Sequence, residues 1–217
     1  MARTRLSPSR QANIKNANIG KIILFCEGET EKNYFEYFAD ILTKNKYNNI
    51  QVVVETASGN ASRVLNAADE YLKNEVNLRK YANYKKYLVF DCDAPPNVQR
   101  VINKMLISMN NYELVVSNHI FEIWLLMYFE EVELKLSKKK IYEKLTLHLN
   151  TRYEKASAGI IRKIIKEGAI ESALRNAEAL EAKYMKSEMD ITHSIGKMNP
   201  YTNVHILVEQ LMSAISN

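Results

Sequence analysis

Three acidic residues follow two apolar segments of the chain, in an order that could assemble a cation-binding site. Glu27 comes directly after the apolar run 22–26, and Asp91 and Asp93 follow the run 87–90. In open α/β sheets, ligands bind beyond the carboxyl ends of the strands. Three carboxylates there would bind a hard cation, Mg²⁺ or Mn²⁺, and that cation would direct the site toward phosphate chemistry. The alternative is that Asp91 and Asp93 cap a turn and that Glu27 is merely exposed.

Glu122 is a further carboxylate in an unusual setting. It is the only charged residue in the otherwise apolar segment 120–129. A carboxylate in such a segment is expected to be paired or to reach a polar site. The segment follows a predicted strand, so its start could face the same crevice as Glu27. A structural buried ion pair would explain the pattern equally well.

Several basic residues are candidates for contacts with phosphate groups. Basic residues interleaved with tyrosines suit a nucleic-acid surface, and this pattern surrounds residues 85–86. A second basic group lies between residues 152 and 163. The candidates are Lys85, Lys86, Arg152, Lys155, Arg162 and Lys163. The competing interpretation is that these charges belong to solvated faces of the protein.

The elements that must position these residues follow from hydrophobic periodicity. Short apolar, β-branched runs predict strands at 21–26, 50–55, 87–91 and 112–116. Helical spacing predicts helices between them, one starting after Thr30 as its N-cap and another spanning about 61–76. This alternation predicts an α/β fold with a mostly parallel four-stranded sheet flanked by helices. Right-handed crossovers would then bring Glu27, Asp91 and Asp93 to one edge of the sheet.

The rest of the chain reads as helical. A buried helix is predicted over 120–129, and further helices over 170–186 and 204–215, with 199–202 as a turn that caps the last one. We therefore expect a basic, weakly structured arm at 1–19 and one domain over 20–217. The domain would consist of a core, 20–130, and a helical C-terminal part, 131–217.

Composition sets limits on the class of protein. The chain has 217 residues, is 47% hydrophobic and carries a net charge of +5, which permits a nucleic-acid partner without requiring one. No signal peptide is visible, and the longest apolar stretch, 123–129, is too short to cross a bilayer, so a cytoplasmic protein without membrane contact is expected. The chain lacks a Gly-x-x-x-x-Gly-Lys-Ser/Thr loop, which argues against its being an ATPase. Its oligomeric state, a homodimer included, is left open.

Five segments occur in an order that resembles the RloB-like proteins, which are grouped with the Toprim fold. The segments are CEGETEKNYFEYF (26–38), VFDCD (89–93), SNHIFEIWLLMYF (117–129), YEK (153–155) and NPYTNVHILVEQL (199–211). The resemblance runs from about residue 20 to the C-terminus. His119 departs from the pattern, because the family usually has proline there.

The resemblance implies a function that spacing alone does not. Toprim domains carry a glutamate after the first strand and an Asp-x-Asp pair after the third, which here are Glu27 and Asp91 with Asp93. It implies an effector nuclease of anti-phage defence, acting with an ATPase of the RloA or ATP-binding-cassette type. Glu122 and Lys155 would be supporting catalytic residues. The alternative is a non-catalytic Toprim-like module that binds nucleic acid, a nucleotide signal or the partner ATPase.

Overall fold

The computed structural model of the protein describes residues 20–44, 51–57, 59–93, 95–108 and 110–215. The predicted basic arm, 1–19, lies outside these residues. The strands are β1 (Lys21–Cys26), β2 (Gln51–Thr56), β3 (Lys85–Asp91), β4 (Tyr112–Asn118) and β5 (Tyr201–Thr202). The helices that alternate with the strands are α2 (Glu29–Lys44), α3 (Ala61–Lys73), α4 (Glu75–Lys80) and α5 (Pro95–Met105). Those that follow β4 are α6 (Glu122–Leu126), α7 (Lys138–Leu149), α8 (Ala158–Glu167), α9 (Ile170–Lys186), α10 (Ile191–Ser194), the 3-10 turn η1 (Ile195–Lys197) and α11 (Val204–Ile215).

The strands form one sheet in the order β2-β1-β3-β4-β5. β1 to β4 are parallel, whereas β5 pairs antiparallel with the end of β4, placing Thr202 opposite Ser117. The predicted α/β class and mostly parallel sheet are confirmed, but the prediction of four strands is wrong. The fifth strand has two residues, too few for any alternation of apolar and polar residues to be visible in sequence. The prediction that 199–202 is only a turn is corrected in the same way.

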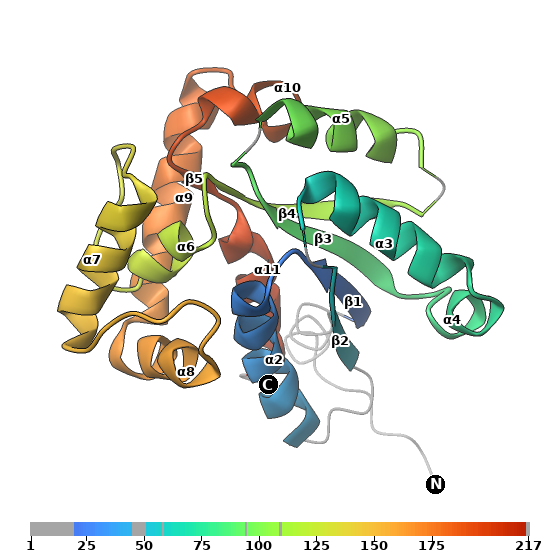
Figure 1. Ribbon diagram of the computed structural model, residues 1–217, viewed down its shortest axis with the longest axis horizontal. Coiled ribbons are helices and arrows are strands. Elements are labelled where there is room, and N and C mark those ends of the chain that lie inside the picture. The colour runs from blue at the N-terminus through green and yellow to red at the C-terminus, as the bar shows by residue number, and fades with distance from the viewer. Residues whose placement is uncertain (1–19, 45–50, 58, 94, 109, 216–217) are drawn as a thin grey trace, which may run out of the picture.

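Helices cover both faces of the sheet (Figure 1). α3 and α5 lie over one face and α2 and α11 over the other, while α6 to α9 gather on the side away from α4. Alternate residues of the strands pack into two apolar cores, one on each face of the sheet. Ile22 and Leu24 of β1 pack with α2, α6 and α11, whereas Ile23 and Phe25 pack with α3 and α5. Both faces of the central strands are therefore buried, as expected for a parallel sheet.

Local departures from the predicted elements have local causes. The predicted helix over 61–76 is interrupted at Asn74, whose side chain accepts hydrogen bonds from two backbone N–H groups of α4 and so starts a new helix. The buried segment 120–129 is regular helix only over Glu122–Leu126. Helix α2 begins at Glu29, so Thr30 lies inside it instead of capping it. None of the described helices combines the length and apolar character needed to span a bilayer.

Candidate active site

Glu27 and Asp91 meet at the carboxyl ends of neighbouring strands. The backbone N–H of Glu27 continues the ladder beyond β1 by donating to the Val89 carbonyl at 2.9 Å. The Glu27 side chain then turns toward β3, where its Oε2 accepts a hydrogen bond from the Asp91 backbone N–H at 3.0 Å. Asp91 is 7% exposed, and its Oδ1 accepts from the Phe121 N–H at 2.7 Å. The two carboxylates are thus held by backbone groups at one edge of the sheet.

Glu31 lies in the first turn of α2 and is 3% exposed. Its Oε2 is buried without a hydrogen-bond partner among the described residues. A Cβ atom added to Gly28 would lie 2.9 Å from this oxygen, so the absence of a side chain at Gly28 makes room for the carboxylate. Sequence reasoning did not assign Glu31 a role in the site. The four-residue spacing from Glu27, across the turn between strand and helix, was the signal available for it.

Glu122 starts α6 and is completely buried. Its Oε1 accepts hydrogen bonds from the hydroxyls of Tyr142 and Tyr153, each at 3.2 Å. Its Oε2, like that of Glu31, is buried and has no partner within the described part of the chain. The tyrosines come from α7 and from the α7–α8 loop (residues 150–157), and sequence reasoning did not assign them a role in the site.

Lys155 is carried by the α7–α8 loop and is exposed. Tyr153 anchors the loop to Glu122, and the backbone N–H of Ala156 donates to Thr30 Oγ1 at 3.1 Å. Asn33 Nδ2 also donates to the Ala156 carbonyl at 2.9 Å. These hydrogen bonds hold the loop against the first turns of α2. Lys155 therefore lies close to the carboxylates, although more than 120 residues separate it from Glu27 in the sequence.

The electrostatics show that these groups act on one another. Burial, followed by the charges of Glu31 and Asp93, raises the pKa of Glu27 to about 7, against the opposing hydrogen bond from Asp91. Burial also raises the pKa of Glu31 to about 7, and the charge of Glu122 contributes in the same direction.

Asp91 and Lys155 complete the electrostatic picture. Burial and the charges of Glu31, Glu122 and Glu27 raise the pKa of Asp91 well above its usual range. Although burial works against its charge, the surrounding carboxylates, Glu122 first, raise the pKa of Lys155. The arrangement therefore concentrates negative charge around one lysine, and protons occupy some of the carboxylates near neutral pH.

Asp93 lies just beyond β3 and is exposed. Its charge helps to raise the pKa of Glu27, so it lies near the cluster. Within the described residues, no three His, Cys, Asp or Glu side chains are arranged so that they could hold a metal ion together as they stand. The ligand atoms nevertheless suit a hard cation, because every acidic side chain of the cluster offers carboxylate oxygens. Two of these oxygens, on Glu31 and Glu122, are buried and have no partner among the described residues.

The candidate phosphate-binding residues are divided between two regions. Lys85 and Lys86 lie at the amino end of β3. They are therefore about 20 Å from Asp91, which lies at the carboxyl end of the same strand. Arg152 is exposed in the α7–α8 loop and Arg162 is exposed on α8. Lys163 Nζ donates to the Leu149 carbonyl at 2.7 Å, so it has a structural role between α7 and α8. Among these candidates, Arg152 is nearest in sequence to Lys155.

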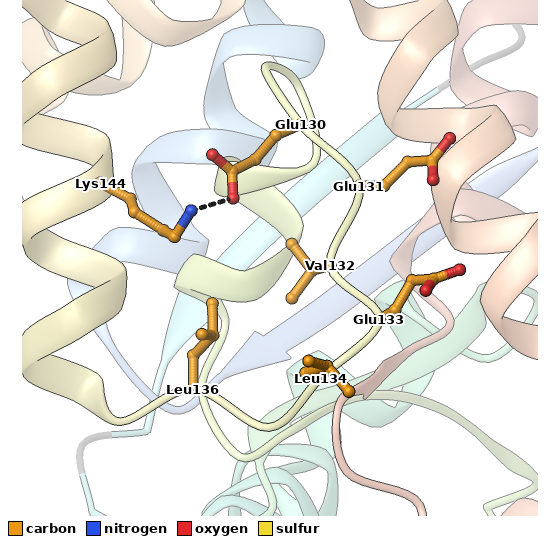
Figure 2. Close-up of a pocket in the computed structure, with 7 residues that line it drawn as sticks. All are labelled: Glu130, Glu131, Val132, Glu133, Leu134, Leu136 and Lys144. Atoms are coloured by element: carbon orange, nitrogen blue, oxygen red, sulfur yellow. Dashed lines mark hydrogen bonds and ion pairs between the residues drawn. The ribbon is translucent and has the colours of Figure 1, made fainter.

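A surface cavity of about 350 Å³ lies elsewhere, along the segment between α6 and α7 (Figure 2). Figure 2 shows Glu130 pointing to Lys144, with which it forms an ion pair at 2.6 Å, while Glu131 and Glu133 point to the other side of the segment. None of the predicted site residues lines this cavity. The carboxylate cluster and this cavity are therefore separate features.

Comparison with known proteins assigns the family. The sequence profile of the RloB-like protein family matches residues 22–211. The match spans most of the chain, including every carboxylate of the cluster and Lys155, and the protein therefore belongs to the RloB-like family. No curated protein and no solved structure shows significant similarity to it.

Proposed function

We propose that the protein is a metal-dependent nuclease that hydrolyses phosphodiester bonds of DNA or RNA. The observation that carries the proposal is the carboxylate cluster. Acidic side chains from the end of β1, from α2, β3 and α6 act on Lys155, and two of their buried oxygens have no partner among the described residues. A buried unpaired carboxylate costs several kcal/mol, so the cluster is hard to explain as a stabilising feature. A function that needs a cation accounts for it.

Glu27, Asp91 and Asp93 are the residues that would hold Mg²⁺ or Mn²⁺, with Glu31 and Glu122 close by. Mg²⁺ commonly takes one or two protein carboxylates and retains several waters, so a pre-formed set of three ligands is not required. The bound cation would act as a Lewis acid that stabilises charge on a phosphate oxygen. Because Glu27 and Glu31 have pKa values of about 7, cation affinity should rise with pH through that value as protons leave.

Glu27 is suited to proton transfer. One of its oxygens is held by the Asp91 backbone N–H, which leaves the other available to solvent or substrate. A pKa of about 7 lets the group accept a proton from water or return one at neutral pH. Lys155 would stabilise negative charge that develops on the phosphate, because neighbouring carboxylates keep it protonated.

The test is a cleavage assay with labelled single-stranded DNA, duplex DNA and total RNA in Mg²⁺ or Mn²⁺. Asp91→Asn keeps an oxygen that can accept from the Phe121 N–H, so the fold should survive while cleavage falls at least about a hundredfold. Glu29→Gln is the matched control, because Glu29 is exposed in the same first turn that carries Glu31. Full metal-dependent cleavage by Asp91→Asn would refute the assignment.

A second candidate function is a non-catalytic module that binds nucleic acid, a nucleotide signal or an ATPase. The lack of a ready-made three-ligand group within the described residues favours it. Such a module would bind its partner without any cleavage, and Asp91→Asn would leave that binding unchanged. The same variant therefore separates the two candidates.

Family membership supports proposals about context. We propose that the fold is of the Toprim type and that the protein acts in anti-phage defence beside an ATPase of the RloA or ATP-binding-cassette type. The chain's own lack of a phosphate-binding loop fits the need for a separate ATPase. Co-purification of the tagged protein with the ATPase encoded beside it tests the partnership.

A further inference from the structure

Lys138 is the first residue of α7 and Lys135 lies three residues before it, and both are exposed. Neither forms an ion pair with any residue that the structure describes. The two lysines that follow differ in this respect: Lys139 and Lys140 face Glu143 at 3.9 and 3.5 Å. Around the start of α7, two lysines thus have no ion-pair partner among the described residues, beside two lysines that pair with Glu143.

A chain of contacts connects these lysines to the carboxylate cluster. Lys138 Nζ lies 5.8 Å from the centre of the Tyr142 ring. The hydroxyl of that tyrosine donates to Glu122 Oε1 at 3.2 Å. Lys138 is therefore separated from the buried carboxylate by a single aromatic ring.

His119 supplies an independent measure of the same proximity. It follows β4 and is half-buried. Burial and then the charges of Lys135 and Lys138 lower the pKa of His119, while Asp93 and Glu122 act on it in the opposite sense. The two lysines and the two acids are therefore all close enough to the imidazole for their charges to act on it.

The positive charges of Lys135 and Lys138 could offset the repulsion between the carboxylate cluster and a nucleic-acid strand. A phosphodiester strand that approaches several carboxylates is repelled unless cations lie along its path. The charge of Lys155 is already offset by the carboxylates of the cluster. Lys135 and Lys138, in contrast, form no ion pair with any residue that the structure describes. Partly exposed rings beside basic side chains, here His119 and Tyr142, are typical of surfaces that track a nucleic-acid backbone.

Resting on the proposed function, we infer that Lys135 and Lys138, with His119 beside them, bind the phosphate backbone of the nucleic-acid strand next to the cleavage site. The strand, DNA or RNA, passes over the start of α7 and reaches the carboxylate cluster at its exposed member, Asp93. Binding along this path is independent of base sequence and depends strongly on salt. Lys85 and Lys86 lie at the amino end of β3, away from the cluster, and take no part in this binding.

The experiment measures binding without cleavage, by fluorescence anisotropy of a fluorescein-labelled single-stranded 20-mer, as DNA and as RNA, in EDTA. The double variant Lys135→Gln/Lys138→Gln should weaken binding about tenfold or more. It should also reduce the slope of log affinity against log salt by about 1.4, which corresponds to two phosphate contacts on a single strand. The control Lys139→Gln/Lys140→Gln removes the same charge from the same helix and should leave the slope nearly unchanged.

The outcomes are distinct. A larger loss for one of the two probes would support the inference and identify the strand that the path accepts. Equal weakening by the two double variants, or no weakening by either, would overturn this inference while the nuclease proposal stands. Failure of the wild-type protein to bind either probe would also overturn this inference, whereas the cleavage assay with Mg²⁺ or Mn²⁺ decides the nuclease proposal.

Discussion

Replacing Glu31 by glutamine should stabilise the metal-free protein at alkaline pH, although the residue is almost fully buried. Glu31 has a pKa of about 7 in the folded state, against an unperturbed value near 4.3 in an unfolded chain. The folded state therefore binds more protons than the unfolded state between these two values. Stability from Glu31 is complete below about pH 4.3 and is lost as the pH rises through about 7.

The magnitude follows from the size of the shift. A rise from about 4.3 to about 7 corresponds to roughly 4 kcal/mol at 1.36 kcal/mol for each pKa unit. Relaxation of the site and water entry reduce this figure, so we expect Glu31→Gln to add up to about 3 kcal/mol at pH 8.5. At pH 4 the glutamate is protonated and resembles glutamine, so the two proteins should differ by less than about 0.5 kcal/mol.

Urea unfolding in EDTA at pH 4, 6, 7 and 8.5 measures this difference, with Glu29→Gln as the exposed control from the same turn. The gain from Glu31→Gln should grow with pH and level off above about 8, whereas the control should remain flat. Adding Mg²⁺ should narrow the gap at pH 8.5, because a bound cation would offset the charge of Glu31, which the variant lacks. A destabilisation of equal size at every pH would show that Glu31 is held by favourable contacts and would refute the reasoning.

Three further changes test how the site is held together. Tyr153→Phe removes one of the two hydroxyls on Glu122 and should lower the free energy of unfolding by about 1–3 kcal/mol in urea; an unchanged value would mean that this bond contributes nothing. Gly28→Ala should displace the Glu31 carboxylate and weaken Mg²⁺ binding several-fold by calorimetry at nearly unchanged stability, and unaltered affinity would contradict the crowding. Thr30→Val removes the acceptor that holds the α7–α8 loop and should slow cleavage about tenfold with a normal circular dichroism spectrum. Unchanged cleavage by that variant would show that the loop needs no such anchor.

The three acids at the strand ends illustrate how far sequence reasoning reaches. Glu27 and the Asp91–Asp93 pair follow short apolar runs, and parallel strands joined by right-handed crossovers end at one edge of a sheet. The placement of these residues together follows from local patterns and one general rule of chain topology. The same reasoning missed β5, because a two-residue strand is defined by its hydrogen bonds to β4 and not by its own pattern.

Glu122 shows where local patterns fail. Sequence marks it as a carboxylate in an apolar segment, which leaves a buried ion pair and a functional acid equally open. In the structure it bonds to two tyrosines and has no ion pair with any described residue. Those partners come from α7 and the loop after it, 20 and 31 residues further along the chain.

The sequence by itself determined the class of fold, the family and the strand-end acids, because hydrophobic period and motif order are local properties. Only the tertiary structure decided that Glu31 is buried and that Lys155 lies close to the cluster. These facts depend on how the α7–α8 loop packs against α2 and α6. The pKa of a carboxylate rises when it loses solvent and when other negative charges lie near it, and both effects come here from residues that are distant in sequence.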